Sequence, residues 1–278
     1  MKYKLLSIDL DRTLLTPCFA KVTKKDALAI QKYLSAGGKV CINTGRAPWS
    51  AKKFIDYINS FGPNKIQFLS AYNGGYIYDY LDKETHIQTI PHSTVKRIYD
   101  LVLKHNAHIW IHSVNGEQNK SIETNKLIYK YFIKFFRSLN LIKVKDLNKL
   151  ESFKMNIFSA SKNKINCFYK DCCKLNLQKQ ATFCMSRPKV IEISPKNSNK
   201  GVILSMLSKK YKIDRSQIMS IGDSFNDKAA FVVSGYAIGV KPKEQPLEKF
   251  CNRVIRKNIN AVSYIINNLV LDKNPKKK

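Results

Sequence analysis

Short apolar runs alternate with amphipathic stretches along the first third of the chain. The run YKLLSID over residues 3–9 ends in an acid and predicts a buried strand of a parallel sheet. A helix is expected at about 23–36, followed by a second buried strand, KVCINTG. The next helix has Pro48 in its first turn, where the missing N–H costs no hydrogen bond. This succession of strands and helices predicts βαβ units.

The hydrophobic pattern changes after Gly75. The segments YIYDY and HIQTI alternate apolar and polar positions on either side of residues 81–84, which predicts a β-hairpin. Beyond the hairpin we expect the strands HIWIHSV, KMNIFSA and ATFCMS and helices at about 93–106, 122–139 and 163–176. Residues 83–188 are therefore interpreted as an inserted α/β domain.

Parallel-strand character returns after Lys189. The strands VIEIS, QIMSIGD and YAIGV alternate there with helices expected from about 199, at about 226–233 and near 260–270. We therefore predict an α/β protein with a Rossmann-like, parallel-sheet core. This core is expected to consist of residues 1–82 and 189–278, with residues 83–188 as the inserted domain.

The bulk composition narrows the class of protein. With 278 residues, 44% of them apolar, the chain can fill a sizeable core. Asp9 and Asp11 interrupt the first apolar run before it reaches the length of a secretory signal. No later run approaches the ~20 residues of a membrane span. We therefore expect a soluble cytoplasmic protein that has no membrane partner.

A formal net charge of +29 at pH 7 is the most unusual property of the composition. Taken alone, it would suggest binding to nucleic acid or to an anionic surface. The excess consists mainly of lysines scattered along the whole chain, which favours a general composition bias and disfavours nucleic acid as a partner. A basic surface would still attract small phosphorylated metabolites.

Polar clusters interrupt the apolar pattern, and two of them lie near the N-terminus. Asp9 and Asp11 follow the first predicted strand, two residues apart, so both can converge on one ligand; a turn rich in capping residues is the alternative. Thr44 and Gly45 follow the second strand, just before a helix whose free N–H groups can bind an anion. An ordinary N-cap is the alternative for this cluster.

Two further clusters lie in the last third of the chain. Lys200 opens a predicted helix, and one lysine among so many is unremarkable by itself. Between Gly222 and Asp227, two acids and an amide crowd a strand-to-helix turn, where carboxylates suit Mg²⁺; a plain capping cluster is the alternative. We expect all four clusters at the C-terminal ends of parallel strands, where open α/β sheets bind ligands. Together they predict one site.

With these motifs the chain resembles the Cof-type branch of the haloacid dehalogenase-like hydrolases. DLDRTLL is similar to the DxDxT motif of that family, NTGR to its Thr/Ser motif, SPKNSNKG to its Lys motif and GDSFNDKAAF to its GDxxND motif. The resemblance spans essentially the whole chain and keeps the motif order. It implies a Mg²⁺-dependent phosphatase of small phosphomonoesters, such as sugar phosphates, nucleotides or phosphorylated cofactors, with the inserted domain as a cap that selects the substrate.

The resemblance also implies roles for single residues. Asp9 would be the nucleophile, transiently phosphorylated, and would bind Mg²⁺ together with Asp223 and the main-chain carbonyl of Asp11. Asp227 would orient the site from behind the metal. The Asp11 side chain, two residues beyond the nucleophile, is suited to act as general acid and base. The transferred phosphoryl group would be held by the Leu10 amide, Thr44, Gly45, Lys200 and Asn226.

The sequence departs from the family pattern mainly at Arg12, which stands where glycine is usual. Its guanidinium would suit a second anionic group of the substrate, but we favour the interpretation that it points to solvent. A different class of function is a nucleic-acid-binding protein on a decayed fold of this family, motivated by the net charge of +29 and by Arg12. The intact DxD and GDxxND motifs favour the enzyme.

Overall fold

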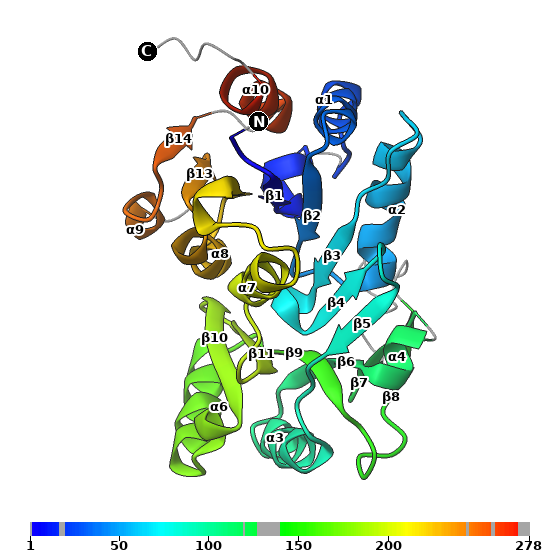
Figure 1. Cartoon of the computed structure of the whole chain (residues 1–278). Coiled ribbons are helices and arrows are strands. Elements are labelled where there is room, and N and C mark those ends of the chain that lie inside the picture. The colour runs from blue at the N-terminus through cyan, green and yellow to red at the C-terminus, as the bar shows by residue number, and fades with distance from the viewer. Residues whose placement is uncertain are drawn as a thin grey trace. The chain divides into compact units, whose positions relative to one another are not determined.

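The computed structural model describes residues 2–16, 20–118, 120–126, 140–242, 245–256 and 259–271. The chain forms two compact units (Figure 1): unit 1 comprises Met1–His86 and Asn199–Lys278, and unit 2 comprises Ile87–Ser198. The predicted α/β class, a parallel-sheet core with a second α/β unit, is confirmed. In the described part of the chain, no helix is both long and apolar enough to span a bilayer.

The described residues of unit 1 contain an eight-stranded sheet with the strand order β14-β13-β12-β1-β2-β3-β4-β5. The bounds are β1 Leu5–Ile8, β2 Lys39–Asn43, β3 Phe68–Ala71, β4 Tyr76–Asp79, β5 Glu84–Ile87, β12 Ile218–Gly222, β13 Tyr236–Val240 and β14 Arg253–Ile255. The strands from β14 to β3 pair in parallel, and β4 pairs antiparallel with β3. β1 is buried along its whole length, as expected of a central parallel strand.

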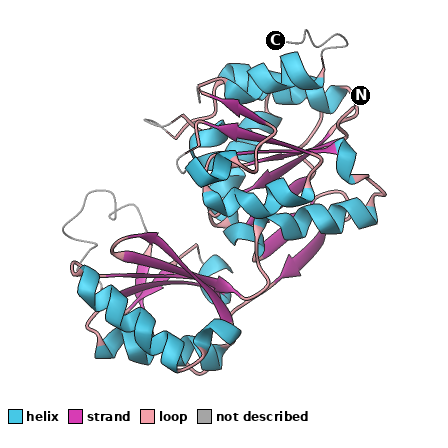
Figure 2. Cartoon of the chain, turned by 90° about the vertical axis from the view of Figure 1, so that its left-hand side faces the viewer, coloured by secondary structure: helices cyan, strands magenta, loops and turns pink. Residues whose placement is uncertain are grey.

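Helices cover both faces of this sheet (Figure 2). The bounds are α1 Lys24–Ser35, α2 Pro48–Asn59, α7 Lys200–Lys210, α8 Lys228–Val233, α9 Gln245–Glu248 and α10 Ala261–Ile265. Leu6 and Ile8 of β1 belong to a core shared with α1, α2 and α10, whereas Leu5 belongs to a core shared with α7 and α8. Successive side chains of a strand point to opposite faces, so β1 anchors both layers.

The described residues of unit 2 contain a six-stranded sheet with the strand order β10-β11-β9-β6-β7-β8. The bounds are α3 His92–Lys104, β6 His108–Ser113, α4 Val114–Gln118, β7 Ile122–Thr124, β8 Leu141–Lys143, β9 Ser152–Phe158, α6 Lys162–Lys174, β10 Ala181–Arg187 and β11 Val190–Pro195. Helices α3 and α6 share one apolar core with β6, β9 and β11. The helix expected at 122–139 begins instead with β7, and residues 127–139 lie outside the described part of the chain.

The segment VIEIS was expected to return to the core sheet, and this prediction is wrong. It forms β11, which pairs antiparallel with both β10 and β9 in unit 2. Every second residue of β11 is buried, which is typical of an antiparallel strand with one covered face. The units accordingly divide after His86 and after Ser198, later in the chain than the expected boundaries of 82/83 and 188/189.

Candidate active site

Asp9 follows β1 directly and is buried. Its main-chain N–H donates to the carbonyl of Ile221 in β12 at 3.0 Å, so the parallel pairing of β1 and β12 fixes the start of the next turn. This turn, Leu10–Leu14, begins with the buried Leu10 and is closed by a hydrogen bond from the Leu15 N–H to the Leu10 carbonyl. The backbone that carries Asp9 is therefore held at both ends.

Lys200 joins two buried carboxylates in this site. Its ammonium donates to Asp9 Oδ1 at 2.7 Å and to Asp227 Oδ1 at 2.6 Å, and its side chain is itself buried. The other oxygen of Asp227, Oδ2, accepts from the main-chain N–H groups of Asp223 and Ser224, both at 3.0 Å. Asp227 thus connects the turn after β12 to the start of α7.

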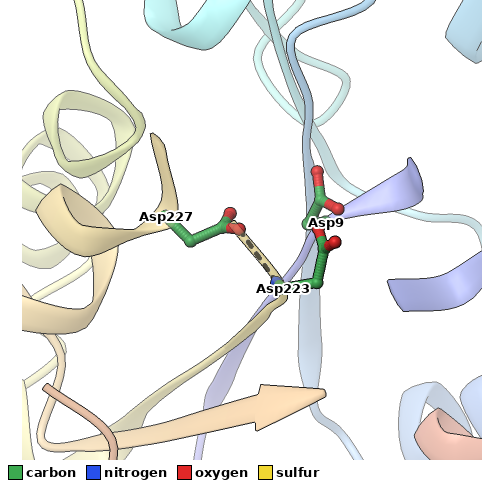
Figure 3. A group of neighbouring side chains, drawn as sticks. All are labelled: Asp9, Asp223 and Asp227. Carbon is green, nitrogen blue, oxygen red and sulfur yellow. Dashed lines mark hydrogen bonds between the residues drawn. The ribbon is translucent and has the colours of Figure 1, made fainter. Parts of the chain in front are cut away.

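Three of the described carboxylates, those of Asp9, Asp223 and Asp227, offer oxygen atoms within 4.8 Å of one another, and all three residues are buried (Figure 3). Gly222 allows this close packing. A Cβ atom added at Gly222 would lie 2.3 Å from Cγ of Asp227 and would push that carboxylate away. The glycine of the GD motif is therefore required by the position of Asp227.

Charge and burial oppose one another in this group. Burial raises the pKa of Asp9, and the charges of Asp227 and Asp223 raise it further against the lowering effect of Lys200. Burial alone would lower the pKa of Lys200, but the charges of Asp227 and Asp9 raise it. Asp9 and Asp227 thus share one buried ammonium, and Asp223 adds a third buried carboxylate to the group. Such an excess of buried oxygen ligands fits a hard divalent cation, which would compensate the remaining negative charge.

Thr44 and Gly45 lie after β2, the neighbour of β1 in the sheet. Thr44 is buried, its N–H donates to the Ser70 carbonyl at 2.8 Å, and its hydroxyl accepts from the Arg46 N–H at 3.2 Å. A Cβ atom at Gly45 would lie 3.0 Å from Oδ1 of Asn73, so the absence of a side chain lets the Asn73 amide approach. The same oxygen accepts from Nδ2 of Asn226 at 3.2 Å.

Asp11 lies beside these groups and is held by a residue from another strand end. Both of its carboxylate oxygens accept hydrogen bonds from Arg46, at 2.7 and 2.5 Å, and its side chain is 53% exposed. Asp9 and Asp11 therefore follow the same strand but have different environments. Arg46 was part of the quoted NTGR motif, yet nothing in the sequence pairs it with Asp11.

Asn43 is the first residue of the quoted NTGR motif, but the sequence analysis assigned no contact to it. From the end of β2, its amide donates to the main-chain carbonyl of Lys200 at 2.7 Å and to Oγ of Ser7 at 3.1 Å. It thereby ties β1 and β2 to the first residue of α7. The sequence placed this polar residue at the end of an otherwise apolar strand, but it did not predict the contact with α7.

Two expectations about the site are corrected. Lys200 does not follow a parallel strand, because β11 belongs to the antiparallel sheet of unit 2; the lysine enters the site from the first turn of α7. Arg12 does not simply point to solvent. Its side chain is 43% exposed, but Nε lies 3.4 Å from Oδ2 of Asp223. The other predicted site residues lie around the ends of β1, β2 and β12, where the sequence analysis expected them.

Comparison with known proteins confirms the resemblance found in the sequence. Residues 6–266 match the family model for haloacid dehalogenase-like hydrolases. The chain is 27% identical, over 96% of its length and 98% of the relative's, to the 5-amino-6-(5-phospho-D-ribitylamino)uracil phosphatase YwtE of Bacillus subtilis. It is 22% identical, over 85% of its length and 83% of the relative's, to the HMP-PP phosphatase of Serratia proteamaculans. A haloacid dehalogenase-like hydrolase from Bacteroides thetaiotaomicron has the same fold, with a TM-score of 0.80, 22% identity and coverage of 96% and 99% of the two chains.

Proposed function

The chain belongs to the haloacid dehalogenase-like hydrolase family, as a phosphatase, and we propose that it hydrolyses small phosphomonoesters with Mg²⁺ and through a phosphorylated Asp9. One observation carries this proposal: the buried ammonium of Lys200 contacts both Asp9 and Asp227. An ammonium beside an attacking carboxylate offsets the repulsion between that carboxylate and an anionic phosphate ester.

The proposed reaction has two steps. In the first step, a carboxylate oxygen of Asp9 attacks phosphorus, and the bond between phosphorus and the ester oxygen breaks. The Asp11 carboxyl group donates a proton to this leaving oxygen. In the second, a water molecule passes a proton to Asp11 and attacks phosphorus, and the bond to Asp9 breaks. The phosphoryl group would be held by the Leu10 amide, Thr44, Gly45, Lys200 and Asn226.

The contact between Asp11 and Arg46 adds a condition to this scheme. Both carboxylate oxygens of Asp11 accept hydrogen bonds from Arg46, and a guanidinium offers only hydrogen-bond donors. This contact must open before Asp11 can give a proton to the leaving group in the first step. Movement of Arg46 away from Asp11 is therefore part of the proposed cycle.

The carboxylates of Asp9 and Asp223 and the main-chain carbonyl of Asp11 would hold Mg²⁺, with Asp227 orienting the site from behind. When bound, the ion neutralises charge on the phosphoryl oxygens. Charge supports this assignment, because the three buried carboxylates carry more negative charge than Lys200 and Arg12 supply as positive charge.

A small phosphorylated metabolite is the proposed substrate, and a cytoplasmic location belongs to the same proposal. The names of the two relatives support the substrate class, since they specify a phosphoribitylamino-uracil and HMP-PP. Unit 2 would select among phosphate esters. If so, replacing residues 87–198 with a short linker should make the rates with different esters more nearly equal. A core that retained the full preference of the parent would exclude this role.

Hydrolysis of p-nitrophenyl phosphate tests the mechanism. The purified protein should turn over this ester with Mg²⁺ and stop when a chelator removes the metal. Asp9→Asn should lower the rate by about 10³-fold or more, because the amide cannot form the acyl phosphate. The matched control is Asp56→Asn, an exposed residue paired with Lys52 on α2, which should keep the parent's rate. Undiminished activity in Asp9→Asn would exclude Asp9 as the nucleophile.

The nucleic-acid-binding alternative makes an opposite prediction. It requires association with a random oligonucleotide that falls steeply as salt is added, and that is indifferent to Asp9→Asn. The family match over residues 6–266 favours the enzyme.

A further inference from the structure

We propose that Arg12 competes with the divalent cation for Asp223, so that the identity of residue 12 sets how tightly this enzyme holds its metal. The inference rests on the proposed function, since it assumes a cation at the carboxylates of Asp9 and Asp223. It concerns a position at which the chain departs from the family pattern. It therefore addresses a property of this chain and not of the family.

The backbone presents Arg12 to the carboxylate group in a fixed orientation. Arg12 has φ 66° and ψ 0°, in the left-handed region that is unfavourable for a residue with a Cβ atom. The hydrogen bond from the Leu15 N–H to the Leu10 carbonyl closes the turn that contains Arg12. The hydrogen bond from the Asp9 N–H to the Ile221 carbonyl anchors the residue before this turn. The side chain therefore starts from a defined point two residues before the end of the turn.

The guanidinium contacts the carboxylate that the cation needs. Nε of Arg12 lies 3.4 Å from Oδ2 of Asp223, while the other oxygen, Oδ1, accepts from the hydroxyl of Ser224 at 2.9 Å. The Asp223 side chain is only 4% exposed, so its two oxygens face these neighbours and the other buried acids. A divalent ion bound to Asp223 would lie close to the guanidinium, and the two positive charges would repel each other.

Arg12, and not Lys200, is the group expected to give way. Lys200 is buried and donates to two buried carboxylates, so moving it away would leave the negative charges of both carboxylates without this partner. The Arg12 side chain is 43% exposed and can move its charge into water at small cost. Cation binding is thus expected to displace Arg12 from Asp223, and this displacement weakens the apparent affinity for the metal.

The test is Mg²⁺ binding by isothermal titration calorimetry in the absence of any substrate. Arg12→Gly and Arg12→Gln should both lower the Kd for Mg²⁺ by about 3- to 30-fold, through loss of the ion pair and of the repulsion. Arg12→Gln keeps a long side chain and the strained backbone, so it isolates the charge. The matched control is Arg256→Gln, an exposed arginine paired with Glu248, which should leave the Kd within a factor of two.

The possible outcomes separate this inference from the proposed function. If the parent binds Mg²⁺ and both Arg12 variants bind it with the parent's Kd or more weakly, the inference is overturned and the proposed function stands. Tighter binding in Arg12→Gly but not in Arg12→Gln would assign the effect to backbone strain and would also overturn it. If the parent shows no saturable Mg²⁺ binding, the cation site itself is refuted, and the inference with it.

Discussion

At the scale of single residues, the chemistry of this site depends on what each of two neighbouring acids touches. Asp9 is buried against Lys200, whereas Asp11 is half-exposed and bound to Arg46. A buried carboxylate beside an ammonium is suited to attack phosphorus, and an accessible one is suited to exchange protons with water. The two acids can therefore divide the work although only Leu10 separates them.

This division of labour predicts a substrate-dependent defect in Asp11→Asn. The amide cannot donate a proton, so phosphorylation of the enzyme by a sugar phosphate should slow by about 10²- to 10⁴-fold. With p-nitrophenyl phosphate the leaving group needs no proton, and the same step should be far less affected. Because the variant also lacks the base for water, phosphoenzyme should accumulate on Asp9. Rapid-quench burst kinetics with mass spectrometry of the Asp9 peptide would measure both effects.

The control for this experiment is Asp56→Asn, which changes an exposed acid outside the site. Equal losses of burst rate with both classes of ester would mean that Asp11 positions the turn or the metal, and that the general acid is another group.

Residue-level contacts were the least predictable part of the site. The sequence identified Asp9, Asp223 and Asp227 because carboxylates at the ends of apolar strands stand out from the pattern. It did not pair Arg46 with Asp11 or bring Arg12 to Asp223. The hydrophobic pattern predicts where strands begin and end. The conformation of a long side chain, in contrast, depends on neighbouring residues that come from distant parts of the sequence.

At the scale of elements, one short turn connects three parts of the site. Tyr72, Asn73 and Gly74 all have positive φ, although Tyr72 is a buried aromatic residue. The turn is held by hydrogen bonds from the Tyr72 N–H to the Arg46 carbonyl and from the Asn73 N–H to the Thr44 carbonyl, both at 3.0 Å. Backbone strain that the surroundings hold in place is often found at functional sites.

The amide of Asn73 is therefore predicted to position Asn226 for phosphate binding. Asn73→Gly keeps the left-handed backbone but removes the oxygen that accepts from Asn226. Loss of one such hydrogen bond should raise the KM for p-nitrophenyl phosphate about 5- to 10-fold, with a smaller change in kcat. Steady-state kinetics at saturating Mg²⁺ would measure this.

The matched control is Asn176→Gly, at an asparagine with φ 55° in unit 2, which should leave KM unchanged. A loss confined to kcat in Asn73→Gly would contradict the positioning role.

Elements were predictable where their pattern was unambiguous. β1 and β2 are short, mainly apolar and almost fully buried segments, and they form as expected. The misassigned β11 shows what limits such a prediction: VIEIS is short, and the same residues suit a parallel core strand or an antiparallel strand with one covered face. In the structure, β11 is an antiparallel strand of unit 2 in which every second residue is buried. Lys200 therefore lies in the first turn of α7 and does not follow a strand of the core sheet.

At the scale of the whole molecule, the two units have separate apolar cores. The main cores of unit 1 contain residues of β1, β2 and the helices on both faces, whereas α3 and α6 share a core with strands of unit 2. Because each unit has an apolar core of its own, we expect the units to unfold in separate steps. A spectroscopic probe in one unit should then report the stability of that unit.

Unit 2 is predicted to lose stability in mild acid through His112 of β6. Burial, with the nearby charge of Lys154, lowers the pKa of His112 from 6.5 to about 3. Between these two pKa values the unfolded chain binds a proton that the folded chain does not. Stability is therefore complete above pH 6.5 and falls as the pH decreases towards 3, by up to about 1.4 kcal/mol per pH unit.

Urea unfolding followed by Trp110 fluorescence would measure this effect. The chain contains two tryptophans, so Trp49→Phe leaves Trp110 of β6 as the single reporter on unit 2. In that background, lowering the pH from 7 to 5 should reduce the free energy of unfolding of unit 2. The reduction should be larger by up to about 2 kcal/mol than in the His112→Gln variant, whose glutamine cannot titrate in this range. The matched control is His92→Gln at the exposed start of α3, which should keep the parent's pH dependence. Parallel pH profiles for the parent and His112→Gln would show that the His112 imidazole does not couple folding to protonation, and that the acid sensitivity of unit 2 has another origin.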